Sequence, residues 1–179
     1  MNADSERDVV RILGIDPGSL FTGYGVIDHD GRKLRHVTSG CLRIQGKAFP
    51  QRLREIFFGV RKLVEEFRPR ELAIEQAFVH KNADSALKLG QARAAAICGT
   101  LEFDLAIYEY TPRAVKQAVV GKGAAAKEQV QHMMRILLNL RGDLQADSAD
   151  ALAVAVCHAH SRDLQSHLGN VAGFGGRGK

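Results

Sequence analysis

The first forty residues alternate short apolar runs with polar turns, which is the pattern of consecutive β-strands. We expect strands over residues 11–16, 23–28 and 34–43. Pro17-Gly18 ends the first run, and His29-Asp30-Gly31-Arg32 forms a polar turn after the second. Because the connections are short, these three strands are predicted to form an antiparallel meander.

The period of the pattern then changes, and helices alternate with strands. Apolar residues recur at three- and four-residue steps from Leu53 to Phe67, which predicts an amphipathic helix that ends before Pro69. The remaining pattern predicts a strand over 72–75, a helix over 83–101, a strand over 106–109, a helical segment from 112, and helices over 127–140 and 146–160. Helical crossovers between strands imply parallel pairing. The expected fold is α/β, with one five-stranded mixed sheet flanked by helices.

The length of 179 residues fits a single domain, which we place at residues 9–165. We expect residues 1–8 to be a flexible extension and residues 166–179 to be a disordered, glycine-rich basic tail. The first residues carry charges of both signs, unlike a secretory signal, and no apolar run approaches the ~20 residues of a membrane span. Cys41, Cys98 and Cys157 are far apart, which argues against structural zinc and disulfides and fits a reducing cytoplasm.

The charge balance is basic, with 25 Lys and Arg against 20 Asp and Glu. The excess is concentrated between residues 111 and 127, which contain four basic and no acidic residues: Arg113, Lys116, Lys122 and Lys127. This segment is predicted either to contact phosphates or to be an ordinary solvated loop and helix face.

Four acidic residues stand next to apolar segments. Asp16 and Glu75 each end a short buried strand, and parallel neighbours would bring them together at one edge of the sheet. Asp147 and Asp150 open the last predicted helix three residues apart, so they share one helical face. If all four converge, their mutual repulsion calls for a counter-cation, and oxygen ligands favour Mg²⁺ or Mn²⁺. Two such ions ~4 Å apart suit hydrolysis of a phosphodiester.

Each acid also has a structural alternative. Asp16 before Pro-Gly could form a turn, and Glu75 could be a buried acid paired with a basic residue. Asp147 could cap the last helix, with Asp150 favoured in its first turn by the helix dipole. His158 and His160, further along that helix, are interpreted as packing or surface residues.

Four segments resemble a known family. They are Gly14-Ile15-Asp16-Pro17-Gly18-Ser19 with residues 22–26, Ile74-Glu75-Gln76 with residues 81–93 (KNADSALKLGQAR), residues 115–121, and residues 145–153. Together they resemble, in order and over residues 12–160, the RuvC family of bacterial Holliday-junction resolvases. The resemblance implies an RNase H-like fold, a homodimer, and Mg²⁺-dependent, symmetric nicking of two like-polarity strands of four-way junction DNA in recombination and repair. It also implies association with the branch-migration proteins RuvA and RuvB.

The resemblance assigns roles to individual residues. It implies that Asp16, Glu75, Asp147 and Asp150 are catalytic and hold two Mg²⁺ ions, with Mn²⁺ as a substitute. It places Lys116 and Lys127 near the scissile phosphate, and Phe78 near the junction centre, where an aromatic ring could stack on a base. The other basic residues expected to face DNA are Lys81, Lys88, Arg93, Arg113 and Lys122.

The helix over 83–101 is the candidate dimer face, because its small residues Ala86, Gly90, Ala94 and Cys98 allow a close approach. They could equally pack on the chain's own sheet. The sequence disfavours two other functions. An actin-like or sugar-kinase-like ATPase needs two such domains and a second phosphate loop, and a DNA-binding module without chemistry would gain nothing from four acids beside phosphates.

Overall fold

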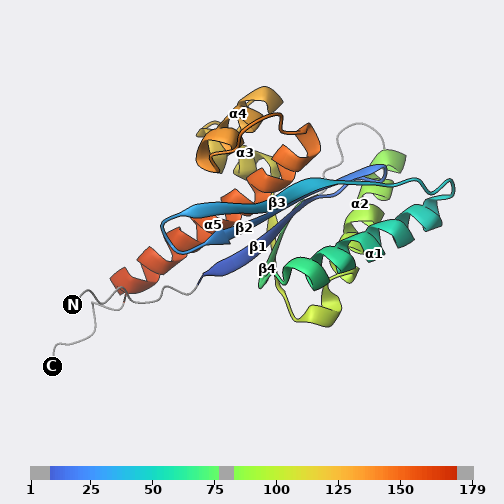
Figure 1. The fold of residues 1–179 in the computed structure, drawn as a ribbon, viewed down its shortest axis with the longest axis horizontal. Helices are drawn as coiled ribbons and strands as arrows, with labels where there is room; N and C mark the ends of the chain where they lie inside the picture. The colour runs from blue at the N-terminus through green and yellow to red at the C-terminus, as the bar shows by residue number, and fades with distance from the viewer. Residues whose placement is uncertain (1–8, 77–82, 173–179) are drawn as a thin grey trace.

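The computed structural model describes residues 9–76 and 83–172, and side chains as far as Leu164. Its elements in chain order are β1 (Val10–Asp16), β2 (Phe21–His29), β3 (Leu34–Arg43), α1 (Phe49–Phe67), β4 (Glu71–Glu75), α2 (Ala83–Cys98), the 3₁₀ turn η1 (Leu101–Phe103), β5 (Ala106–Tyr110), α3 (Pro112–Val120), α4 (Lys127–Leu137) and α5 (Ala146–Ala172). The five strands form one sheet in the order β3-β2-β1-β4-β5 (Figure 1). The first three strands are antiparallel, and β1, β4 and β5 are parallel, as the sequence predicted.

Four helix boundaries differ from the prediction. Helices α2 and α4 each end three residues early, at Cys98 and Leu137. Helix α1 begins at Phe49 rather than Leu53, since Pro50 is tolerated in the first turn, where its missing N–H costs no hydrogen bond. The backbone of α5 continues to Ala172 rather than ending at His160, so the predicted domain boundary at 165 lies inside this helix. The chain has no proline after Pro112 to interrupt it.

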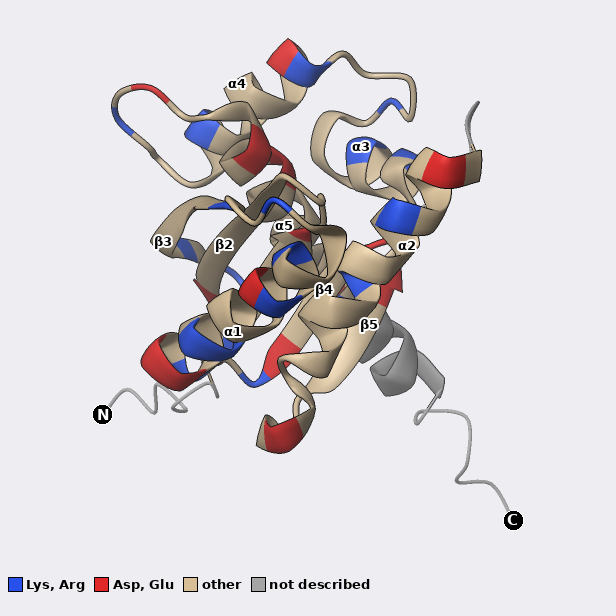
Figure 2. Cartoon of the chain, turned by 90° about the vertical axis from the view of Figure 1, so that its right-hand side faces the viewer, with Lys and Arg blue, Asp and Glu red and all other residues tan. Residues whose placement is uncertain are grey.

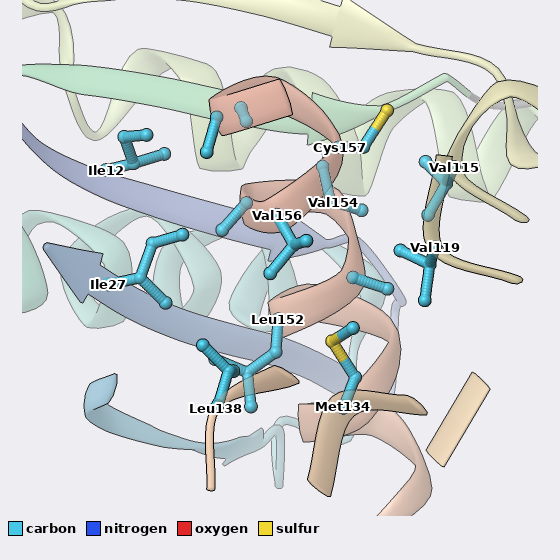
Figure 3. Close-up of a cluster of buried hydrophobic side chains, with 14 of the residues drawn as sticks. Ile12, Ile27, Val115, Val119, Met134, Leu138, Leu152, Val154, Val156 and Cys157 are labelled. Carbon is cyan, nitrogen blue, oxygen red and sulfur yellow. The ribbon is translucent and has the colours of Figure 1, made fainter. Parts of the chain in front are cut away.

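Helices cover both faces of the sheet, and alternate residues of each strand point to opposite faces. On one face, Leu13, Ile15 and Ile74 pack against α1 and α2. On the other face, Ile12 and Ile27 pack with side chains of α3, α4 and α5 (Figure 3). Helix α5 is the centre of this second cluster, and all residues from Ala151 to Ala159 are buried.

Helix α5 lies unusually close to the sheet, because glycines face it from β1 and β2. A Cβ added to Gly14 would lie 2.2 Å from the carbonyl oxygen of Ala151. One added to Gly23 would lie 2.1 Å from the carbonyl oxygen of Asp147, and one added to Gly25 would lie 2.7 Å from the Leu152 side chain. These three positions therefore fix the depth at which α5 packs.

No helix within the described ranges is both long enough and apolar enough to cross a bilayer.

We expect Gly14→Ala to destabilise the fold by ~1–3 kcal/mol, because the methyl group would meet the backbone of α5, which cannot move without disturbing the core. Urea unfolding followed by circular dichroism measures the difference. Glu66→Ala, at an exposed position of α1, is the control, since a surface helix substitution of this kind changes stability little. Equal stability of the Gly14→Ala variant and the parent protein would show that α5 does not depend on this contact.

Candidate active site

Asp16 and Glu75 lie side by side at one edge of the sheet. They are the last residues of the parallel neighbours β1 and β4, one position beyond the Ile15–Ile74 pair of the ladder. Gly14 and Ala73, two residues earlier, face α5. Because side chains alternate along a strand, Asp16 and Glu75 face the same side. The parallel pairing of β1 with β4 therefore places both acids at the carboxyl edge of the sheet, as the sequence predicted.

The first turn of α5 brings Asp147 to the same edge. Its backbone packs over Gly23, which is the ladder partner of Asp16. The Cys41 thiol, on the next strand, lies 3.7 Å from Asp147 Oδ2 in a donor contact to this carboxylate. Helix α5 begins at Ala146, so Asp147 is inside the first turn and the alternative prediction that it is the N-cap is wrong.

The turn after Asp16 is closed by a different residue. The Thr22 hydroxyl donates to the carbonyl oxygen of Gly18 at 2.8 Å, and the Gly18 amide faces the same hydroxyl at 3.5 Å. Asp16 is consequently left to face the helix rather than to hold the turn.

A cleft of about 300 Å³ opens between the sheet edge and helices α2 to α5. Three of the predicted acids line it, Asp16, Glu75 and Asp150, together with Lys116 of α3 and Lys127 of α4. Asp147 does not line the cleft, although its charge acts on both Asp16 and Asp150. The apolar part of the wall includes Leu89, Val115 and Val130.

Burial and mutual repulsion raise the pKa values of the carboxyl groups in the cleft. Burial, followed by the charges of Glu75 and Asp150, raises the pKa of Asp16 to about 8. Burial and the charge of Asp150 raise the pKa of Glu75 to about 7, against the opposing effect of Lys116 and Lys127. The pKa of Asp150 is also raised by burial. These three carboxyl groups cannot all be ionised near neutral pH without additional positive charge nearby.

Lys127 supplies part of that charge. Its Nζ lies 3.4 Å from Asp150 Oδ2, and the neighbouring carboxylate raises the pKa of the lysine. The side chain is 69% exposed, so it pairs with Asp150 from the solvent side of the cleft.

The donor set fits a hard divalent cation, since the described residues that line the cleft offer carboxylate oxygens and no sulfur or imidazole. The acidic side chains are not gathered around a single point. Within residues 9–76 and 83–164, no three His, Cys, Asp or Glu side chains are grouped tightly enough to enclose a metal ion. Holding one would require the carboxylates to move closer together than they are in this structure.

The other residues predicted to face DNA differ in their surroundings. Phe78 and Lys81 lie outside the described residues. Arg113 and Lys122 are exposed, and α3 with its basic residues lies on the cleft side of the molecule, near α2 (Figure 2). Lys88 is half exposed on α2 and pairs with Asp84 at 2.6 Å.

Arg93 points inward, in contrast to the prediction that it faces DNA. Its Nε donates to the carbonyl oxygen of Glu75 at 3.2 Å, and its Nη2 lies 2.5 Å from Glu109 Oε1 of β5. Only 19% of its side chain is exposed. The guanidinium therefore holds the end of β4, and with it Glu75, because it is engaged by two neighbouring strands.

His158 is buried, as its interpretation as a packing residue predicted. Its Nε2 lies 2.6 Å from Glu71 Oε2, and its Nδ1 lies 2.6 Å from the Tyr110 hydroxyl. It belongs to the core beneath α5 rather than to the cleft. The close approach of α5 to Gly23 and Gly25 was not predicted from the sequence, although two glycines at alternate positions of a strand indicate a close approach by another backbone.

Known proteins resemble this chain over most of its length. Residues 12–158 match the family model described as crossover junction endodeoxyribonuclease RuvC. The curated RuvC of Methylococcus capsulatus is 55% identical over 160 residues, which cover 89% of this chain and 96% of that protein. The RuvC of Dichelobacter nodosus is 57% identical over 152 residues, covering 85% of this chain and 86% of that protein.

Solved structures agree with the sequence comparisons. Thermus thermophilus RuvC in complex with Holliday junction substrate superposes with a TM-score of 0.81 at 33% identity, covering 87% of this chain and 96% of that one. A yeast mitochondrial Holliday junction resolvase shares the fold, with a TM-score of 0.67 at 15% identity, over 92% of this chain and 84% of that one. The fold, the acids at the strand ends and these comparisons lead to one conclusion: the chain belongs to the RuvC family of crossover junction endodeoxyribonucleases.

Proposed function

We propose that this chain is a structure-specific endonuclease that resolves four-way DNA junctions by nicking two strands of like polarity. The observation that carries the proposal is the cleft, in which acids from β1, β4 and α5 face two lysines from α3 and α4. The names of its relatives, and the junction substrate in the Thermus thermophilus complex, support the substrate class. The association with RuvA and RuvB stays a prediction.

Asp16, Glu75, Asp147 and Asp150 would hold the divalent cations, two Mg²⁺ ions or Mn²⁺ in their place. When bound, these ions would supply the positive charge that activates a water molecule and stabilises the departing 3′ oxygen. The carboxylates themselves do not attack. Burial disfavours their charged form in the absence of a cation, as the raised pKa values of Asp16 and Glu75 indicate. A bound cation would stabilise the ionised carboxylates, so cation binding and the loss of their protons are coupled.

Lys116 and Lys127 would bind the phosphate next to the acids. Lys127 is held at 3.4 Å by Asp150 but remains largely exposed, so its ammonium group can transfer from the carboxylate to a phosphate oxygen. Lys116 faces the cleft from α3. Positive charge placed at the scissile group stabilises the charge that develops in the transition state.

A DNA-binding module without chemistry is the second candidate, and the cleft disfavours it. Acids beside phosphates weaken binding, and burying them costs free energy that binding alone would not recover. The family membership of the chain also removes the ATPase alternative.

We expect the purified protein to nick a synthetic four-way junction symmetrically in the presence of Mg²⁺. Asp16→Asn should reduce the single-turnover cleavage rate by at least about a hundredfold, because it removes a charged ligand from the buried edge of the cleft. Junction binding, measured by fluorescence anisotropy, should be retained. Glu102→Gln, at an exposed acid of η1, is the control. Cleavage by Asp16→Asn at the parent rate would contradict the assignment.

The proposed enzyme is a homodimer that pairs through α2. Ala83, Ala86, Leu87, Gly90, Gln91 and Ala94 line an apolar hollow of about 470 Å³ on the outer face of this helix. Leu87 is 67% exposed there. Three of the small residues predicted for the interface, Ala86, Gly90 and Ala94, line this hollow, and Cys98 does not. A two-fold partner would suit a junction with two equivalent strands to cut.

Leu87→Asp should convert the protein from dimer to monomer, because a buried unpaired carboxylate at the centre of a two-fold interface is costly on both copies. Sedimentation velocity over a range of protein concentrations measures the molecular mass. Leu101→Asp, at an equally exposed leucine of η1, is the matched control and should remain dimeric. A monomeric parent protein, or a dimeric Leu87→Asp variant, would refute this interface.

A further inference from the structure

Phe21 and Arg43 form an exposed pair at the edge of the sheet, beyond the acids. Phe21 is the first residue of β2 and Arg43 is the last residue of β3, and the two are partners in the ladder. Phe21 is 53% exposed and Arg43 is also exposed. A single exposed phenylalanine is ordinary on a protein surface, so its location and surroundings must decide whether it has a role.

The ladder places this pair on the same face as the acid cluster. The preceding pair is Gly23 with Cys41, and both contact Asp147, Gly23 through the helix backbone and Cys41 through its thiol. Residues two apart on a strand share a face. Phe21 and Arg43 therefore stand on the face that carries Asp147, one step further toward solvent.

The backbone that carries Phe21 is held in place on both sides. The carbonyl oxygen of Leu20 accepts a hydrogen bond from the Ile44 amide at 2.9 Å. Thr22 is fully buried and bonded to Gly18, and a Cβ on Gly18 would lie 2.1 Å from the Phe21 carbonyl oxygen. The tight turn holds the backbone of Phe21 in place. Binding through the Phe21 ring would therefore cost little conformational entropy.

Arg43 is available to an anion. No residue in the described part of the chain forms an ion pair or hydrogen bond with its guanidinium. The Cα atoms of Asp16 and Arg43 are separated by two strand spacings across the sheet and by two residues along the strand. This separation is ~12 Å. At 3.4 Å of rise per nucleotide this corresponds to about three nucleotides of one DNA strand.

We propose that Phe21 and Arg43 form a second DNA-contact site on the β3 side of the acid cluster, in which Arg43 binds a phosphate and Phe21 stacks on a base of the same strand, about three nucleotides from the cut. The inference rests on the proposed junction-cleaving function. It adds a contact on the β3 side of the acids to those proposed for Lys116 and Lys127 in the cleft.

The test uses the full chain in the Asp16→Asn background, so that the junction stays intact. Binding is measured by fluorescence anisotropy at several salt concentrations, with 2-aminopurine placed about three nucleotides from the cleavage position as a stacking probe. Phe21→Ala should weaken binding about fivefold or more and remove the change in probe fluorescence, whereas Phe21→Tyr should retain both. Arg43→Ala should reduce the slope of log K against log salt by about one, and Arg43→Lys should preserve it.

Phe58 and Arg54 of α1 provide the matched control, because they are another exposed phenylalanine and arginine in contact, with the guanidinium 5.6 Å from the ring centroid. Phe58→Ala and Arg54→Ala should leave affinity, salt slope and probe fluorescence unchanged. Unchanged binding by Phe21→Ala and Arg43→Ala, with the Asp16→Asn parent still bound to the junction, would overturn the contact site alone. Failure of that parent to bind a junction would overturn the proposed function and the contact site with it.

Discussion

Helix α5 determines what the rest of this molecule can do, because it packs against bare backbone on β1 and β2. At Gly14, Gly23 and Gly25 there is no room for a side chain between strand and helix. This contact lets the first turn of α5 reach the carboxyl edge of the sheet. Asp147 and Asp150 are thereby brought to Asp16 and Glu75, although more than seventy residues separate the two groups along the chain. A bulkier strand would hold the helix, and its two acids, away from the edge.

The close packing also makes the site electrostatically unfavourable until it binds something positive. The apolar length of α5 compensates for burying carboxylates at its start, since its residues from Ala151 to Ala159 are buried. Lys127 relieves part of the repulsion by pairing with Asp150 from the solvent side. The modest net charge of +5 therefore combines an acidic cleft with basic surroundings, and the surface offered to phosphates is more basic than the total suggests.

Much of this fold follows from local patterns, and the remainder depends on tertiary contacts. Short connections predicted the antiparallel meander, helical crossovers predicted the parallel strands, and acids at the ends of apolar runs predicted Asp16 and Glu75. The pattern predicted the start of α5 at residue 146 but not its end at Ala172, and it left open whether Asp147 caps the helix or, as observed, lies in its first turn. Arg93 was expected to face DNA, but Glu109 and the Glu75 carbonyl hold it inside, and both contacts depend on strand order. The Phe21–Arg43 pair likewise exists only through the register of β2 and β3.

The central claim is that residues from the strands and from α5 form one cation site. Isothermal titration with Mn²⁺, in the absence of DNA, tests it most directly by comparing the parent protein with Asp16→Asn on β1 and Asp150→Asn on α5. We expect each substitution to weaken Mn²⁺ binding by at least about tenfold, because each removes a charged ligand of the same site. An Asp150→Asn variant that binds Mn²⁺ as tightly as the parent, while Asp16→Asn does not, would show that α5 contributes no ligand and would contradict the account.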